Sequence, residues 1–498
     1  MRKPTAILLT ALSLAIACYA WGQASFAAVP LPPGEAPAGP EAAFSIEPHT
    51  ALTETHAIFL PLLLRNASNS LPPVTPPGGT LITYVPSEEG DVAVQVTLPE
   101  TPRYADGAGV VVEIATFLTN NNDFYHSLDA AELGLIQVAY LWPGMTSPST
   151  GAHSDGTYDY GGEGSIQALR DVLRYVSGQV PDREGYYLAQ RLAITPLTDQ
   201  VGLYAFSHPG IAAVNVLALY GDEIAGVRYL VGRENPTADT TTAVEIGYFD
   251  DAGQPVLNPL YLYPDSYDPL TLTLDYSSIR WDADYWDAAR GYAGRPYFDL
   301  NDNGLPDAAD HPLGPRVPTM YDKRFYSAAL SQALLDNGAL SEADWPADLG
   351  TAAEAADLWA YRATPHRYPL LATQTPDLKV MLVFSRRDHV QPAADKPHIH
   401  QAYDGFYHGA NLWTRLNPDQ VYVADLGAEL GAQVTEHPAN TEPADWQTVE
   451  GWGSPDTAVA RVLVPLAAVA EMADRAHENN WDPDLDGVLI NYMQRRGR

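Results

Sequence analysis

Cysteine and positive charge are both scarce in this chain. One cysteine stands among 498 residues, so no disulfide can form within it. The 28 lysines and arginines face 62 acidic residues, which gives a formal net charge of −34 at pH 7. A field of that sign repels phosphate backbones and anionic lipid surfaces. The balance therefore excludes nucleic acid as an expected partner and suits an exported protein.

Long apolar runs are also missing, apart from a short one at the N-terminus. Arg2 and Lys3 precede a mostly apolar run over 4–17, which is too short to remain as a membrane-spanning helix. We expect 1–28 to be a signal peptide and the mature protein to be extracellular or anchored at the cell surface. The residues that end at Cys18 resemble a bacterial lipobox, which implies a lipid anchor there. Small residues up to Ala27 suit an ordinary signal peptidase instead, and both alternatives stay open.

Proline and glycine gather in residues 29–78, where segments such as LPPVTPPGG are too rich in both to pack. This region is expected to be a linker. Because the chain has no disulfide, extra stability outside the cell must come from packing or from a bound ion such as calcium.

From residue 79 onward, the order of the expected elements indicates the fold class. Helical periodicity is expected over 165–176, after residue 207 and over about 456–477. Apolar runs typical of strands lie at 81–85, 92–98, 109–115, 135–141, 201–205, 226–231 and 378–384. Alternation of this kind predicts an α/β fold, with a mostly parallel sheet wrapped by helices and a large insertion between core strands.

Ser207 stands between an apolar strand and an apolar helix, in the stretch VGLYAFSHPGIAAVNVLALY. A serine on such a turn is lifted clear of the backbone and points at the start of a helix, as a nucleophilic hydrolase requires. The turn is crowded, and Ala205 and Pro209 stand where glycine is usual, with Gly210 one place later. The alternative is a serine that only caps a buried helix.

Two places in the chain resemble the α/β-hydrolase family, over roughly 80–250 and 375–480. One is the turn at Ser207. The other is SRRDHVQP, where Asp388 follows a strand end as the family's triad acid does, although Ser385 stands where glycine is common. The resemblance implies a hydrolase core in 79–231 and 376–498 and a lid or cap in 232–375. In the family's order of serine, acid and histidine, His437 falls ahead of the last long helix and becomes the expected base.

The resemblance also implies the roles of these residues. His437 would take the Ser207 proton while Asp388 holds the imidazole ring. The backbone N–H of His208 and that of Thr116 or Phe117 would bind the oxyanion. The alternative is that Asp388 caps the next helix and His437 is a loop histidine without a partner.

A second motif, FDLNDNGLPDAAD, matches the spacing of an EF-hand-type calcium loop. Calcium prefers six to eight hard oxygen ligands around a tight turn, which the glycine at position 6 provides. The loop resembles those of dockerins, and we expect a structural calcium ion there. The alternative is an acidic turn without metal. The expected ligands at positions 1, 3, 5, 7, 9 and 12 are Asp299, Asn301, Asn303, Leu305, Asp307 and Asp310.

Other motifs carry weaker expectations. A second acidic stretch at 482–486 resembles half of the calcium pattern, but Met493 stands at its position 12. His389, His398 and His400 suggest zinc, although a His-x-His pair on a helix points to different faces, so a solvated surface is expected. His408 and His477 are set aside as bases. Aromatic residues crowd 261–297, where they either line a pocket over Ser207 or form the core of the cap.

Together these observations predict an exported serine hydrolase that cleaves a carboxylic ester, small or polymeric, with structural calcium and no organic cofactor. A peptidase of the same fold and an inactive hydrolase-like binding protein are the alternatives.

Overall fold

The computed structural model describes residues 72–116, 123–238, 240–261, 274–434, 446 and 449–482. The expected signal peptide with Cys18, almost all of the expected linker, Phe117, His437 and most of the second acidic stretch lie outside these residues. Within the described part, no helix combines the length and apolar character needed to cross a bilayer.

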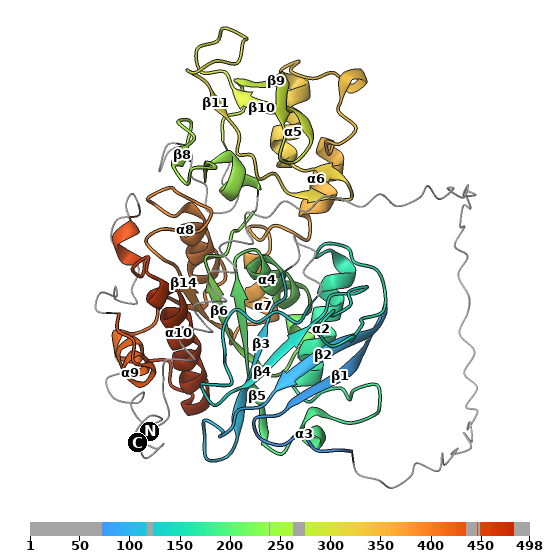
Figure 1. Cartoon of the computed structure of the whole chain (residues 1–498), viewed down its shortest axis with the longest axis vertical. Helices are drawn as coiled ribbons and strands as arrows, with labels where there is room; N and C mark the ends of the chain where they lie inside the picture. Colours follow the sequence, from blue (N-terminus) through green and yellow to red (C-terminus); the bar gives the residue numbers. More distant parts are fainter. Residues whose placement is uncertain are drawn as a thin grey trace, which may run out of the picture.

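An eight-stranded sheet forms the centre of the molecule (Figure 1), in the order β1-β2-β4-β3-β5-β6-β14-β15. β1 and β2 pair antiparallel, as do β2 and β4, and every later pair is parallel. The strands are β1 (Thr80–Ser87), β2 (Gly90–Thr97), β3 (Ala108–Glu113), β4 (Ile136–Tyr140), β5 (Pro196–Phe206), β6 (Val227–Arg233), β14 (Lys379–Val383) and β15 (Trp413–Leu416).

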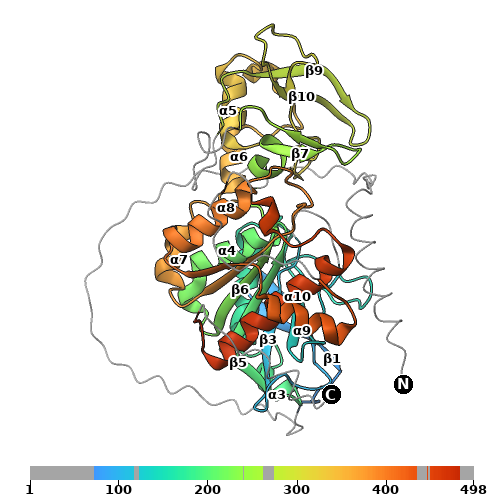
Figure 2. The same ribbon diagram turned by 90° about the vertical axis from the view of Figure 1, so that its left-hand side faces the viewer.

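Helices cover both faces of this sheet, as Figure 2 shows. On one face, α2 (Glu163–Val176), α4 (Pro209–Tyr220) and α7 (Tyr368–Gln374) contribute Ile166, Ile211 and Leu371 to a large apolar cluster. On the other face, α9 (Gln420–Leu430) and α10 (Ala458–Glu478) contribute Val423 and Leu463 to a second cluster. All residues of β3 and β4 are buried, as parallel strands covered on both faces require. The predicted fold class is therefore confirmed.

Several elements of the core were not predicted from the sequence, namely β15, α9, α7 and a one-turn helix at Leu188–Arg191. β15 has four residues, Trp413 to Leu416, and includes a threonine and an arginine. Such a short edge strand gives little alternation to detect. The short helices α3 (Leu188–Arg191) and α8 (Pro397–Asp404) complete the described helices of the core.

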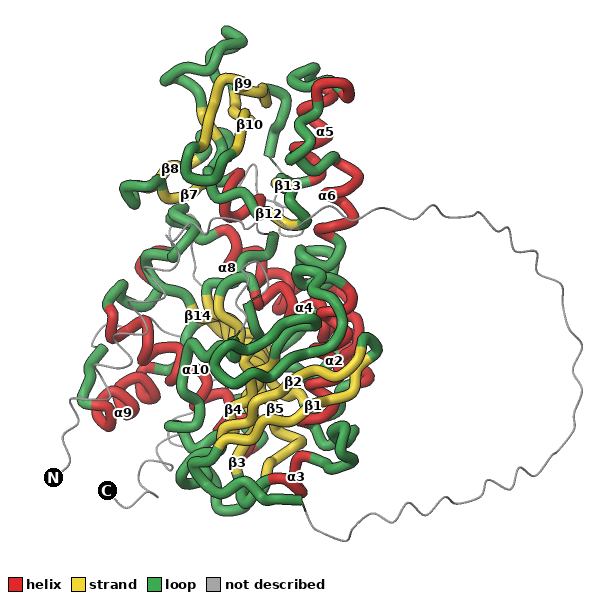
Figure 3. The backbone as a smooth tube through the Cα atoms, turned by 45° about the vertical axis from the view of Figure 1, so that its right-hand side comes forward, coloured by secondary structure: helices red, strands yellow, loops and turns green. Residues whose placement is uncertain are grey.

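A cap of small elements follows β6 and stands over the α8 and α4 end of the core (Figures 1 and 3). Its own apolar cluster includes Ile279, Phe298, Leu330 and Leu334. Trp281 packs against that cluster, whereas Trp286 is 60% exposed. The described aromatics therefore serve the cap core or its surface. The cap consists of the hairpin β7 (Gly247–Phe249) and β8 (Pro255–Leu257), the sheet of β9 (Ile279–Asp287), β10 (Tyr292–Phe298) and β11 (His311–Pro312), the pair β12 (Thr319–Met320) and β13 (Lys323–Arg324), and helices α5 (Ala328–Asp336) and α6 (Ala352–Trp359).

Candidate active site

Ser207 lies on a sharp turn between β5 and α4. Its φ angle is 64°, in the left-handed region that L-residues avoid at a cost of about 1–2 kcal/mol. The Ser207 N–H donates to the carbonyl of Arg233 at the end of β6, at 2.8 Å. A strained serine held by its neighbouring strand is the geometry that the sequence predicted.

Asn235 explains how this turn forms without glycine on both sides of the serine. Its side-chain amide donates to the carbonyl of Ala205 at 3.0 Å and to that of Ser207 at 2.7 Å. Gly210 and Gly232 make room for this amide. A Cβ on Gly210 would lie 2.2 Å from Asn235 Cγ, and a Cβ on Gly232 would lie 2.2 Å from Asn235 Oδ1. The need for glycine is therefore displaced by one residue, to Gly210.

His389 is the histidine that contacts the serine. Its Nε2 lies 2.9 Å from Ser207 Oγ, and its Nδ1 lies 2.8 Å from Glu234 Oε2. Because the carboxylate accepts a hydrogen bond from the Nδ1–H group, Nε2 carries the lone pair that faces the hydroxyl. His389 is exposed to solvent, as expected, with 34% of its side chain accessible, but its contact with Ser207 was not predicted, because it depends on the loop after β14 reaching the end of β5.

Glu234 is the carboxylate that orients His389. It directly follows β6 with a φ angle of 47°, and its side chain is 4% exposed. Oε1 accepts hydrogen bonds from the backbone N–H of Ser385, at 3.2 Å, and from its hydroxyl. Burial and the charge of Asp388 oppose ionisation, but the hydrogen bond and charge of His389 outweigh them, and the pKa of Glu234 is lowered.

Asp388, the acid predicted from the sequence, is buried beside His389 but not bonded to it. Its Oδ1 accepts from the N–H groups of Val390, at 2.7 Å, and Gln391, at 2.9 Å. Its Oδ2 lies 2.9 Å from His398 Nε2, and the nearest approach to His389 Nδ1 is 3.5 Å. In the described geometry the carboxylate that bonds His389 is therefore Glu234 and not Asp388, while the role predicted for Asp388 toward His437 stays a prediction. The role predicted for His437 stays a prediction, because that residue lies outside the described part of the chain.

The electrostatics of His389 follow from its two acidic neighbours. Burial lowers its pKa, but the hydrogen bond to Glu234 and the negative charges of Asp388 and Glu234 outweigh that effect, and the pKa of His389 is raised. For Asp388, burial acts in the opposite direction to the charge and hydrogen bond of His398, which prevail and lower the pKa of the carboxyl. Both carboxyl groups are therefore ionised at neutral pH.

The expected oxyanion donors are described only in part. His208 follows the serine and is the N-cap residue of α4. Burial, and then the charge of His389, hold the pKa of the His208 ring at about 3, so the ring is neutral at pH 7. Thr116 follows β3, and its carbonyl accepts from Trp142 Nε1 at 2.8 Å. The N–H roles predicted for His208, Thr116 and Phe117 stay predictions.

His398 and His400 are buried, so the expectation of a solvated surface was wrong for these two histidines. They bond to different carboxylates: His398 to Asp388, and His400 Nε2 to Asp404 Oδ2 at 3.2 Å. His400 also stacks on Trp446, with ring centroids 4.1 Å apart. Divergent rings do not form a zinc site. Among the described residues, the group of three metal-type donors that lie close together is Glu234, Asp388 and His389.

The expected calcium loop joins β10 to β11, whose pairing at Phe298 and His311 closes its ends. Its side chains turn inward and accept from the backbone of the loop itself. Asp299 accepts from the N–H of Gly304 at 2.9 Å, and Asn303 accepts from that of Leu305 at 2.7 Å. The same inward oxygens are the ones that calcium takes, so the residues fit that ion. Asn301 and Asn303 donate to Asp307, and Asp310 accepts from Leu300 and Asp307.

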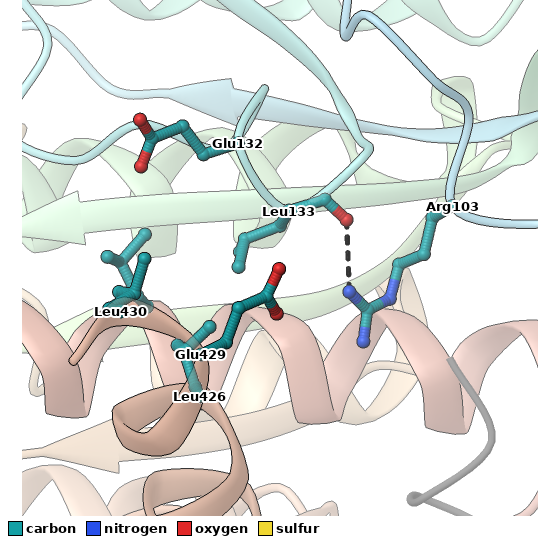
Figure 4. A pocket seen from close by; sticks show the side chains of 7 residues that line it. Arg103, Glu132, Leu133, Leu426, Glu429 and Leu430 are labelled. Atoms are coloured by element: carbon teal, nitrogen blue, oxygen red, sulfur yellow. Dashed lines mark hydrogen bonds between the residues drawn. The ribbon is translucent and has the colours of Figure 1, made fainter. Parts of the chain in front are cut away.

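A hollow elsewhere in the core shares no residue with the Ser207 site (Figure 4). Its one arginine, Arg103, is already bonded to both oxygens of Asp474, at 2.6 and 2.7 Å, and to the carbonyl of Leu133. The hollow offers no convergent set of free polar groups, and we attribute it to the packing of the two helices on that face. It is lined by Arg103, Glu132, Leu133, Leu426, Glu429, Leu430 and Leu466.

The strand order, the parallel centre of the sheet and the strand–serine–helix turn define an α/β-hydrolase fold. No family model matches the sequence, and no curated protein does. Among solved structures, an α/β serine hydrolase without lid from Xanthomonas campestris is 18% identical over 33% of this chain and 65% of that one, with a TM-score of 0.21. Prolyl oligopeptidase B from Galerina marginata is 9% identical over 69% and 34%, with a TM-score of 0.31.

Vibralactone cyclase is 8% identical over 68% of this chain and 69% of its own, with a TM-score of 0.30. This chain spans 65%, 48% and 47% of the first three solved structures that it matches, which is less than two thirds of each. Likenesses at these TM-scores carry no argument about the site. The fold assignment rests on the topology of this chain itself.

Proposed function

We propose that this chain is a serine hydrolase that cleaves a carboxylic ester, with Ser207 as nucleophile, His389 as base and Glu234 as the orienting acid. The supporting observation is the unbroken series of contacts from Ser207 Oγ to His389 at 2.9 Å and from His389 to Glu234 at 2.8 Å. Contacts in this range, with each group in the required order, are what nucleophilic catalysis by serine needs.

The reaction follows from these three groups. His389 Nε2 takes the Ser207 proton as Oγ attacks the ester carbonyl, and the tetrahedral oxyanion lies at the start of α4, where the N–H of His208 is the expected donor. The imidazolium then gives its proton to the leaving alcohol, and an acyl-enzyme remains. Water attacks that acyl group while His389 accepts its proton, and the acid and free Ser207 are released. Glu234 stabilises the imidazolium in both halves.

Ester cleavage is favoured over peptide cleavage by the cap. Within the described residues, the insertion after β6 forms short strands and two helices around its own small core. The residues of the insertion that the structure describes form no propeller or other domain that would gate peptides. A peptidase of the same fold and an inactive binding protein remain as defined outcomes of the experiment.

Fluorophosphonate labelling, together with turnover of 4-nitrophenyl butyrate, tests the proposal. We expect the wild-type protein to form an adduct and to release nitrophenolate, and Ser207→Ala to do neither. His408→Gln is a matched control for substitutions of His389, because His408 also bonds an aspartate, at 3.0 Å, and is exposed. An adduct with turnover of peptide anilides alone would indicate a peptidase. No Ser207-dependent adduct would indicate a binding protein.

We also propose that Asp299, Asn301, Asn303, Leu305, Asp307 and Asp310 hold a structural calcium ion, which pins the end of the β10–β11 hairpin. Extracellular sites of this type bind in the range of about 0.1–1 mM. A hundredfold excess of calcium over Kd would stabilise the fold by about 2.7 kcal/mol.

Thermal unfolding with calcium and with EGTA tests the calcium proposal. We expect EGTA to lower Tm, and Asp307→Asn to abolish the difference. Asp250→Asn is the control, because Asp250 makes similar turn hydrogen bonds in another loop of the cap, to Ala252 and Gln254. An equal Tm under both conditions, together with no calcium by elemental analysis, would contradict the proposal.

We propose finally that the protein is exported and, as one alternative, lipid-anchored at Cys18. Mass spectrometry of the mature N-terminus in a bacterial host separates the alternatives. A diacylglyceryl group on Cys18 indicates the anchor, and an unmodified N-terminus near residue 28 indicates free secretion. A retained Met1 would contradict export.

A further inference from the structure

Arg233 places a positive charge beside the nucleophile. It is the last residue of β6 and lies opposite Phe206 in the register with β5. Its Cζ is 4.5 Å from the centroid of the Phe206 ring, and that same ring lies 5.0 Å from the ring of His389. The guanidinium and the catalytic imidazole therefore contact one aromatic side chain, directly before Ser207.

Among the described residues, no carboxylate forms a close ion pair with Arg233, although the charge of the adjacent Glu234 acts to raise the pKa of the guanidinium. Its neighbour Glu234 uses its oxygens for His389 and Ser385. The buried arginines of the described residues have partners: five pair with carboxylates, and one donates to backbone carbonyls. These are Arg103, Arg170, Arg191, Arg324 and Arg475 in the first group and Arg362 in the second.

Tyr204 provides a second observation at the same place. It precedes Phe206 by two residues on β5 and is fully buried, and its hydroxyl forms a side-chain hydrogen bond with Arg233. Burial raises the pKa of Tyr204, and the charge and hydrogen bond of Arg233 act against that shift. The phenol oxygen can accept from one N–H group of the guanidinium, but it carries no negative charge that would balance the arginine.

We propose that Arg233 binds a carboxylate group of the ester substrate, which makes the preferred substrate an ester that carries one negative charge. This inference rests on the proposed function. A guanidinium suits a carboxylate because both are planar and two parallel hydrogen bonds can form. Stacking on Phe206 holds the guanidinium in place before binding. A dianionic phosphate fits less well, because the ionised Glu234 and Asp388 lie close by and would repel its second charge, and one arginine balances only one charge.

Matched pairs of esters test this inference. On the acyl side, mono-4-nitrophenyl adipate is compared with the 4-nitrophenyl ester of adipamic acid, in which a neutral amide replaces the carboxylate. On the leaving-group side, 4-acetoxybenzoate is compared with 4-acetoxybenzamide. The measured quantity is the ratio of kcat/KM for the charged ester to that for the neutral one. A general effect on the site cancels in this ratio.

We expect the wild-type ratio to favour the charged ester in one of the two pairs by about ten- to a hundredfold, the range for one charge-assisted bidentate contact. Arg233→Met should bring that ratio close to one, and Arg233→Lys should keep part of it. Arg387→Gln is the control, because Arg387 also lies in the active-site loop but stacks on Phe249 and donates to Gly253. Its ratio should match the wild type. A ratio near one in both pairs, or a ratio that Arg233→Met does not change, would overturn the inference.

Calorimetric titration with adipate keeps the test independent of catalysis. In the Ser207→Ala background, we expect adipate to bind at least tenfold more weakly once Arg233 is replaced by methionine. Equal binding would overturn the inference even if esters are cleaved. If the wild-type protein shows no Ser207-dependent labelling but binds adipate in a way that depends on Arg233, the proposed function is excluded and the anion site remains.

Discussion

Replacing Glu234 by glutamine removes the carboxylate that accepts the hydrogen bond from His389 Nδ1. The amide can present an N–H to Nδ1, which favours the tautomer with its proton on Nε2, where it faces Ser207 Oγ and cannot accept. The same kind of change in a serine-hydrolase triad lowers kcat by roughly 10⁴-fold. We therefore expect Glu234→Gln to lower kcat/KM for 4-nitrophenyl butyrate by about 10³–10⁴-fold, which is about 4–5.5 kcal/mol of transition-state stabilisation.

Asp388→Asn is the matched comparison, because Asp388 Oδ1 lies 3.5 Å from His389 Nδ1, against 2.8 Å for Glu234 Oε2. An amide oxygen at position 388 can still accept from Val390 and Gln391, so this variant should lose no more than about tenfold in kcat/KM, equivalent to about 1.4 kcal/mol. Breaking its buried contact with His398 should instead lower stability by about 1–3 kcal/mol, measured by urea unfolding. A larger loss of activity in Asp388→Asn than in Glu234→Gln would refute the assignment of Glu234.

Three further predictions concern the pKa of His389, the space beside Gly210 and the buried carboxyl of Glu113. The pKa of His389 is raised and catalysis needs its neutral form, so the acid limb of kcat/KM should lie above the ordinary histidine value of about 6.5. The limb should move to lower pH in Glu234→Gln, and an unmoved limb would count against the contact between Glu234 and His389. Gly210→Ala should lower the free energy of unfolding by about 1–3 kcal/mol and remove most of the activity, because its Cβ would lie 2.2 Å from Asn235 Cγ. Gly451→Ala, whose Cβ would have no atom within 4 Å, should change neither stability nor activity, and equal effects of the two variants would contradict the role of Asn235. Burial raises the pKa of Glu113 from 4.5 to about 8, so between these pH values the native state holds a proton that the unfolded chain releases. The free energy of unfolding should therefore fall as pH rises from 4.5 to 8, and Glu113→Gln should flatten that fall. An unchanged pH dependence of urea unfolding in this variant would contradict the prediction.

The sequence predicts the strand–serine–helix turn because that signal is local. Residues 201–220 are mostly apolar on both sides of one serine, and the structure confirms both elements. Asn235 was beyond prediction, since its contact with the turn depends on how β6 lies beside β5. The same dependence hides Glu234, which becomes an orienting acid only because the ends of β5, β6 and β14 are neighbours.

His389 was noticed in the sequence and then set aside, because it was treated with His398 and His400 as one group. The adjacent residue Asp388 was assigned a role from the loop pattern alone. A sequence pattern finds the loop that carries a functional residue, but which side chain of that loop faces Ser207 depends on the tertiary fold. The loop over 299–310 was predicted as a tight turn, and its Asx residues and Gly304 favour such a turn by themselves, whereas calcium binding there stays a proposal.

The second-order rate of Ser207 phosphonylation in two histidine variants tests the central claim most directly. If His389 is the base, His389→Gln should slow formation of the adduct by at least about 10³-fold, while His437→Gln reacts at the wild-type rate. A slow His437→Gln beside a fast His389→Gln would contradict the account and return the role of base to His437.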